Sequence, residues 1–303
     1  MNTVLVLLLF LILGYLAQRV LSESGQLLWA DRFNRFVIYL SLPALVFVTM
    51  VDLTVDSRFI LPIASAWGLF LLSVIAILIL SRLLGWSRSI TGALLMLIPF
   101  GNTSFLGIPF TKAFFGEIGI PYAIVYDQLG SFLILSTAGI VILSLYSTQE
   151  ATLGKILYRI LTFPSFIALV LALSIDASLP PQWLMPPLET LAATLTPAAL
   201  LSIGLHLKLR LAAGEWAPLT WGLLIKLILT PLLLLILFHM LSLKSLSAEV
   251  SIFEAGMAPM VSSSMLAIMA GLERRFVASV LGYGIVISFV TLPLWFYLIK
   301  GVL

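Results

Sequence analysis

Long apolar runs dominate this sequence and restrict what it can fold into. Hydrophobic residues make up 61% of its 303 positions and charged residues only 10%, and the mean hydropathy is +1.18. So few polar side chains cannot cover a water-soluble globule of this size. A helix of roughly 18 to 25 apolar residues crosses a hydrocarbon core of about 30 Å. We therefore predict an all-α integral membrane protein with ten transmembrane helices. Their expected ranges are 3–20, 33–51, 59–81, 89–112, 121–145, 156–174, 187–207, 217–241, 248–270 and 276–299.

Basic residues predict how these spans are oriented. Most lysines and arginines fall in the loops that follow odd-numbered spans. Cytoplasmic loops of membrane proteins carry the excess of such residues. We therefore expect both termini on the outer side of the membrane.

Five spans in each half imply that related halves would lie inverted in the membrane. The stretch LSLPALVF at 41–48 resembles LTPAALLSIG at 195–204, and each places a proline inside an apolar helix. Spans four and nine also correspond, with Pro109 in one and Pro259 in the other. We predict two inverted five-helix repeats, 1–146 and 147–303.

Spans four and nine carry residues that a simple membrane helix does not need. The stretch FGNTSFLGIPF runs from 100 to 110, and FEAGMAPMVSSSM lies in span nine. Proline inside a helix costs about 3 kcal/mol or more, and freed backbone groups in a membrane must face protein or a water-filled cavity. Paired interruptions of this kind indicate a transporter binding site, whereas the simpler alternative is a kink with close helix packing. The expected substrate-binding residues are Asn102, Thr103, Ser104, Gly107, Pro109, Pro259, Ser262 and Ser263, and Pro109 is expected to start the second half-helix of span four.

Three charged residues lie inside apolar spans. A charge at the centre of a membrane helix costs about 2.5–3.5 kcal/mol on insertion scales, so each needs a partner. We expect Asp127 and Lys226 to approach one another, either as a structural ion pair or in proton coupling; Glu254 is the third charge. The absence of cysteine and the wide separation of His206 from His239 predict no metal site.

Several motifs together resemble the auxin efflux carrier family of secondary transporters. They are GNTSFLGIPF, YDQLGSF, PAALLSIGLHL and EAGMAPMVSSSM. The short connection from Ser147 to Lys155 resembles the compact bacterial members, whereas Met257 and Ala258 depart from the plant pattern, which has an asparagine in span nine. The resemblance implies a fold distantly shared with bile acid:sodium symporters, with spans four and nine crossing at their breaks. It also implies a scaffold of spans 1, 2, 6 and 7, a mobile core of spans 3–5 and 8–10, and a possible homodimer formed through the scaffold.

We therefore expect a secondary active transporter of a small organic anion in the bacterial cytoplasmic membrane. The resemblance implies elevator-type alternating access and carboxylate substrates such as auxin, malonate or malate. The sequence places no arginine where it could clamp a second carboxylate, so a dicarboxylate is not favoured over a monocarboxylate. The motifs HExxH and GxSxG are absent, which argues against a membrane enzyme. The alternatives are a channel or transporter-like sensor, and a sodium-coupled carrier in which Glu254 binds Na⁺. Without sodium, the carrier would be coupled to a proton gradient or would work as a uniporter. No cofactor is expected.

Overall fold

The computed structural model describes residues 2–51, 56–146, 161–175, 183–207 and 214–303, together with the single positions 154, 158 and 181. In this part of the chain the regular structure is helical and contains no strand, which confirms the all-α prediction. The single β feature there is an isolated antiparallel bridge between Gly101 and Pro259.

Within the described residues, six helices are long and apolar enough to cross a membrane. They are Glu23–Met50, Ser57–Leu84, Glu117–Tyr146, Met185–Leu205, Trp216–Met240 and Arg274–Val302. Shorter apolar helices span Leu5–Ala17, Arg88–Leu97 and Pro164–Ser174. These helices support an integral membrane protein, while the ten spans and the inverted repeat stay predictions.

One helix begins earlier than the sequence predicts. The second span was expected to start at residue 33, but its helix begins at Glu23, because the hydroxyl of Ser22 accepts a hydrogen bond from the amide of Gly25 and caps it. Arg32 and Arg35 therefore lie on a helix and not in a loop. This difference places Arg35 beside the candidate site described below.

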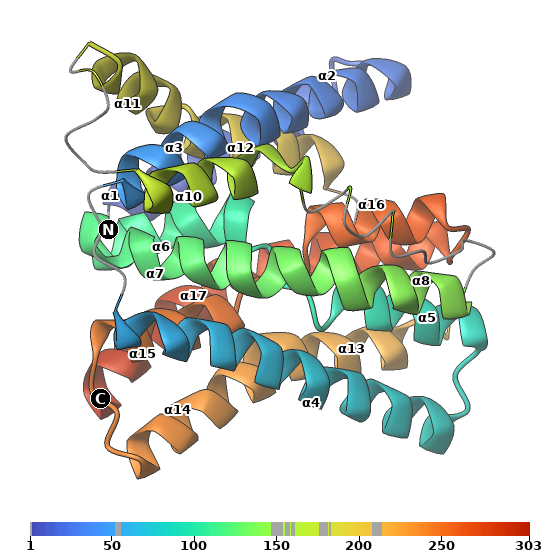
Figure 1. Ribbon diagram of the computed structural model, residues 1–303. Helices are drawn as coiled ribbons and strands as arrows, with labels where there is room; N and C mark the ends of the chain where they lie inside the picture. The colour runs from blue at the N-terminus through green and yellow to red at the C-terminus, as the bar shows by residue number, and fades with distance from the viewer. Residues whose placement is uncertain are drawn as a thin grey trace.

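The helices form two groups in Figure 1. The upper group contains α1 (Asn2–Ala17), α2 (Glu23–Phe36), α3 (Leu42–Met50), α10 (Pro164–Ser174), α11 (Met185–Ala193) and α12 (Leu195–His206). The lower group contains α4 (Ile60–Leu84), α5 (Arg88–Leu97), α6 (Ile108–Phe115), α7 (Ile120–Val125), α8 (Ile140–Tyr146), α13 (Trp216–Leu224), α14 (Thr230–Met240), α15 (Leu246–Ala255), α16 (Val261–Met269) and α17 (Arg274–Val302). Both chain ends lie at the left of this view.

Wide π-helical turns join several of these α-helical pieces. They are η1 (Val37–Ser41), which links α2 to α3, η3 (Thr103–Gly107), η5 (Tyr126–Phe132), η6 (Leu135–Gly139) and η7 (Ile225–Leu229). Such turns are frequent at functional sites because each changes the direction of the side chains that follow it. Asp127 lies in η5 and Lys226 in η7.

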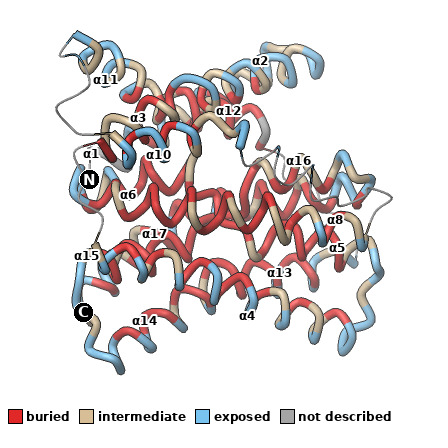
Figure 2. The backbone as a smooth tube through the Cα atoms, viewed as in Figure 1, coloured by how far each residue is buried: buried red, intermediate tan, exposed pale blue. Residues whose placement is uncertain are grey.

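Burial follows the expectations for a protein surrounded by lipid. The buried residues concentrate where the helices face one another, as Figure 2 shows. The outward face of α4 instead exposes Leu71, Leu72, Ile75 and Ile79. An exposed apolar stripe of this kind is unfavourable in water and favourable against lipid tails.

Two glycines bring α1 and α12 into direct backbone contact. A Cβ atom at Gly14 would lie 2.3 Å from the carbonyl oxygen of Leu201, and one at Gly204 would lie 2.3 Å from that of Leu11. Small residues allow this close approach between membrane helices. The amide of Gln18 adds hydrogen bonds to the carbonyls of Gly204 and Leu207, at 2.7 and 3.0 Å. The upper group is therefore held together by contacts that leave no room for a larger side chain.

Candidate functional site

Two interrupted helices meet at their breaks near the centre of the molecule. The first break separates α5 from η3 and α6, and the second separates α15 from α16. The amide of Asn102 donates to the carbonyl of Ala258 at 2.7 Å, and the amide of Met260 donates to the carbonyl of Phe100 at 3.0 Å. This short antiparallel pairing satisfies backbone groups that the breaks would otherwise leave without partners.

The two prolines have different roles at these breaks. Pro109 was expected to start the second half-helix, and it does lie in the first turn of α6. Helical structure nevertheless resumes earlier, in the π-helical turn at Thr103, because the carbonyl of Asn102 accepts the amides of Leu106 and Gly107 at 3.2 and 2.9 Å. Pro259 lies in the second break itself, with its ring against Gly284, where a Cβ atom would lie 2.5 Å from the proline Cδ.

Asp127 receives hydrogen bonds from three neutral donors. The hydroxyls of Thr103 and Ser104 both donate to its Oδ1 atom, the second at 2.6 Å. The amide of Gln128 donates to Oδ2, also at 2.6 Å. These bonds offset part of the cost of burying the carboxyl, which is 1% exposed. They also link η5 directly to the first break.

Asn102 differs from its neighbours because its side-chain amide has no partner. The side chain is 1% exposed, and its Nδ2 atom makes no hydrogen bond. An unsatisfied buried donor costs about 1–3 kcal/mol. Such a cost at a paired break is expected where a ligand supplies the missing acceptor.

Asn102 lines an inner cavity of about 170 Å³. Its lining also includes Ser104, Asp127 and Ser262, and an apolar remainder of Ile38, Leu42, Phe105, Phe132, Leu135, Phe163 and Met260. The upper group contributes the wall from η1, α3 and Phe163, and the lower group contributes η3, η5, the residues around the second break and a residue of η6. The cavity therefore lies between the two groups of helices.

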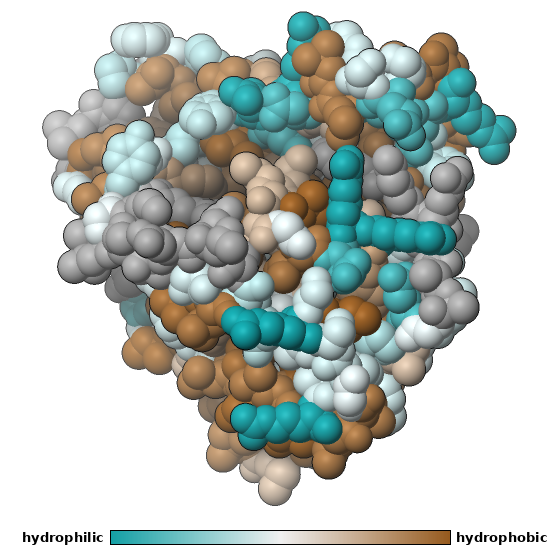
Figure 3. Space-filling model, turned by 90° about the vertical axis from the view of Figure 1, so that its right-hand side faces the viewer, coloured by the Kyte–Doolittle hydropathy of each residue, from teal (hydrophilic) through white to brown (hydrophobic). Residues whose placement is uncertain are grey.

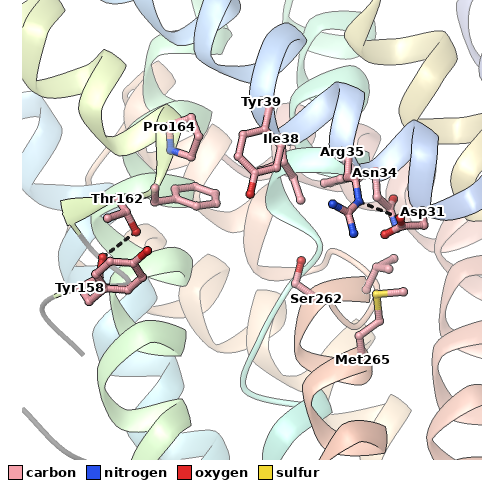
Figure 4. A pocket seen from close by; sticks show the side chains of 13 residues that line it. Asp31, Asn34, Arg35, Ile38, Tyr39, Tyr158, Thr162, Pro164, Ser262 and Met265 are labelled. Carbon is pink, nitrogen blue, oxygen red and sulfur yellow. Dashed lines mark hydrogen bonds and ion pairs between the residues drawn. The ribbon is translucent and has the colours of Figure 1, made fainter. Parts of the chain in front are cut away.

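A larger outer cavity of about 490 Å³ adjoins the inner one. The two share Ile38, Phe105, Phe163 and Ser262 as lining residues. Figure 4 shows Ser262 facing Arg35 and Ile38 across this outer space. Figure 3 views the face opposite the chain ends, where long hydrophilic side chains lie over a largely apolar surface.

Comparison with known proteins shows the family of this chain. Residues 1–296 match a family described as membrane transport protein. The chain belongs to this family. The resemblance to the auxin efflux carriers is thereby confirmed.

Relatives of this transporter align over nearly its whole length. It is 30% identical over 300 residues to an uncharacterized transporter of Methanothermobacter thermautotrophicus, an alignment covering 97% of this chain and 96% of the relative. It is 23% identical over 310 residues to an uncharacterized transporter of Methanocaldococcus jannaschii, covering 97% of both chains.

The expected approach of Asp127 and Lys226 to form an ion pair is not seen in this transporter. Both oxygens of Asp127 face the hydroxyl and amide donors. Lys226 is 5% exposed and instead lies beside the first break, where a Cβ atom at Gly101 would be 3.1 Å from its Nζ atom. Lys226 lies in η7 with its side chain at the crossing of the two broken helices, so Lys226 and Asp127 contact different residues.

Glu254 is buried against the other end of the first break. Its Oε1 atom accepts a hydrogen bond from the hydroxyl of Thr111 at 2.7 Å, and its Oε2 atom has no partner. The carboxyl lies over Gly107, where a Cβ atom would be 2.2 Å from Oε2. Glu254 lines neither cavity, and the described residues contain no cluster of three or more metal-ligating side chains.

Of the two serines predicted to bind substrate, one lines the cavities and the other does not. Ser262 lines both cavities, whereas the hydroxyl of Ser263 donates to the carbonyl of Met260 in its own helix, at 3.0 Å. His239 is exposed at the end of α14, and the side chain of His206 lies outside the described residues, as does most of the connection at 147–155.

The sequence prediction missed the apolar walls and Arg35. Nothing in their immediate sequence marks Phe105, Phe132 or Phe163 as cavity residues. Asp31, Arg35, Ile38 and Leu42, however, recur at spacings that place them on one face of a helix. That period would have indicated Arg35, had the helix start at Glu23 been predicted.

Proposed function

We propose that this protein is a secondary active transporter that carries a small organic anion by elevator-type alternating access. The observation that supports this most is the unpartnered amide of Asn102, which faces a cavity between two groups of helices. A carboxylate oxygen is the acceptor that this donor lacks. In this proposal the protein lies in a bacterial cytoplasmic membrane with both termini outside.

The helix ends at the crossing add to the attraction for an anion. Helical structure resumes at Thr103 in one chain segment and at Val261 in the other, and the amino-terminal end of a helix carries partial positive charge. The apolar walls would hold the rest of the substrate. Carriers with interrupted helices bind their ligands in this manner.

The two groups of helices suit the proposed motion. The upper group would be the scaffold, including the expected dimer contact, and the lower group would be the mobile core. The ten spans would then form two inverted repeats, 1–146 and 147–303. Because the inner cavity has walls from both groups, a shift of the core against the scaffold would open and close it.

Replacing Asn102 tests the proposed site. We expect proteoliposomes to show saturable uptake of a labelled acid from a panel of acetate, malonate, malate and indole-3-acetate. Asn102→Ala should raise KM about 10-fold or more, because a hydrogen bond to a charged group contributes about 1.5–3 kcal/mol. Asn102→Asp should lose more, because it adds a negative charge at nearly the same size. Both variants keep the main-chain hydrogen bonds of residue 102, which join its amide to Ala258 and its carbonyl to Leu106 and Gly107.

The outcome separates the competing functions. Flux that never saturates would favour a channel, and absence of any flux would favour a sensor. Full uptake in Na⁺-free buffer would exclude the sodium-coupled carrier in which Glu254 is a sodium ligand. Unchanged KM in both Asn102 variants would contradict the proposed binding site.

Asp127 is the proposed coupling residue, because a carboxylate in the same cavity repels a bound anion unless it takes up a proton. Uptake by the wild type should therefore rise as external pH falls. Asp127→Asn, which is permanently neutral, should transport with little response to pH. Asp56→Asn is the control, since Asp56 pairs with Arg58 at the protein surface. A variant at position 127 with the wild-type rate and the wild-type pH response would show that this residue does not couple transport to protons.

A further inference from the structure

Among the described residues that line the outer cavity, Arg35 is the cationic one, and it lies on a face that leads to the inner cavity. Asp31, Asn34, Arg35 and Ile38 all lie on the same face of the helix α2–η1 and line the outer space. Ile38 also lines the inner cavity, one helical turn nearer the crossing. An anion moving from the outer to the inner cavity would therefore pass along this face.

Arg35 is held by a partner that an anion could replace. Its Nε atom donates to Oδ2 of Asp31 at 2.7 Å, and its side chain is 71% exposed. Figure 4 shows the guanidinium extending into the cavity toward Ser262, with this ion pair drawn as a dashed line. Exposed ion pairs between residues four apart on a helix contribute only about 0.3–0.5 kcal/mol. The guanidinium remains available for a second carboxylate because it has five donors.

Asn34, on the same face, is fixed in a different way. The hydroxyl of Ser202 on α12 donates to its Oδ1 atom at 2.6 Å, and Asn34 is buried. Arg32, three residues before Arg35, points elsewhere, with its guanidinium 5.0 Å from the centre of the Trp29 ring. Arg35 is thus the basic residue of this helix that faces the cavity.

We propose that Arg35 is an anion-binding residue at the mouth of the transport cavity, which exchanges its Asp31 partner for a carboxylate of the substrate. This inference rests on the proposed transport of organic anions and adds the residue that first engages them. Asp31 then acts as a competitor of the substrate. A guanidinium binds a carboxylate with two parallel hydrogen bonds, which a lysine does not reproduce.

Three single variants test this, each assayed in proteoliposomes with the same four labelled acids. Arg35→Gln should raise KM about fivefold and leave kcat within about twofold, because a charge at the rim acts on capture more than on later steps. Asp31→Asn should lower KM about twofold or more, because it releases Arg35. Arg32→Gln, which removes the same charge three positions away on the same helix, should leave KM unchanged.

The opposite shifts at positions 35 and 31 are the decisive result. An ion pair that only stabilises the helix would make both variants change KM in the same direction or not at all, and either result overturns the proposal. Equal shifts in Arg35→Gln and Arg32→Gln would overturn it too, since they would show a general effect of surface charge. If the wild type takes up none of the four acids, the proposed function falls and this inference falls with it.

Discussion

Gly107→Ala is expected to eliminate most folded, transport-competent protein. The new Cβ atom would lie 2.2 Å from Oε2 of Glu254 and 2.9 Å from its Cδ and Oε1 atoms. The carboxyl has little room to move, because it is fully buried and its Oε1 atom is bonded to Thr111. Overpacking a core costs about 1–3 kcal/mol, and loss of a buried hydrogen bond adds about 1–3 kcal/mol. The loss of folded protein is measured by heating the purified protein in detergent and recording the temperature at which it ceases to be monodisperse.

A second substitution distinguishes a clash from a general intolerance of alanine in this turn. Gly107→Ala combined with Glu254→Ala should recover part of the lost stability, because the double variant removes the atoms that collide. Combination with Glu254→Gln should recover little, since glutamine has nearly the same shape. Gly68→Ala on α4, where a Cβ atom meets nothing within 4 Å, is the matched control and should unfold at or above the wild-type temperature. If Gly107→Ala alone has the wild-type unfolding temperature, the carboxyl of Glu254 can adopt another position, and the predicted clash is wrong.

Gly204→Ala is expected to cause a comparable loss through the backbone. Its Cβ atom would lie 2.3 Å from the carbonyl oxygen of Leu11, 2.7 Å from the amide nitrogen of Tyr15 and 2.8 Å from Cα of Gly14. Main-chain atoms cannot rotate away as a side chain can, so α1 and α12 must separate. The bonds from Gln18 to α12 would then lengthen as well. We expect a fall of several degrees in the unfolding temperature, since about 1 kcal/mol shifts Tm by roughly 2–4 °C in a protein of this size class.

The matching change on α1 provides the internal check. Gly14→Ala should destabilise to a similar degree, because its Cβ atom would meet the carbonyl of Leu201 at 2.3 Å. The double variant should cost less than the sum of the two, because one separation of the helices relieves both contacts. Gly301→Ala near the carboxyl terminus, where a Cβ atom meets nothing, serves as the neutral comparison. Strictly additive effects would indicate two independent defects.

Much of the architecture could be predicted from the sequence because lipid imposes simple rules. Apolar runs marked the helices to within a few residues in most places, and clustered Gly, Asn and Pro marked the two breaks. The start at Glu23 was missed because charged residues such as Asp31, Arg32 and Arg35 lower the hydropathy of α2. The sequence signal for this helix start was the capping residue Ser22, which a search for apolar runs does not consider.

The site was only partly predictable because its contacts join distant segments. Asn102 was a candidate from its type and position, but its missing partner is a property of the folded molecule. The π-helical turns rotate Asp127 and Lys226 toward different neighbours, and their local sequences do not announce those turns. The restart at Thr103 depends on the carbonyl of Asn102, six residues before the first turn of α6 that Pro109 occupies, and nothing in the local sequence predicts it.

The bridge at the crossing also determines what can change there without harm. It is made by main-chain atoms alone, from Asn102 to Ala258 and from Met260 to Phe100. Side chains at 258 and 260 are therefore not required for the join, provided that they fit. Substitutions beside the cavity can therefore alter ligand preference while these main-chain bonds keep the two broken helices joined.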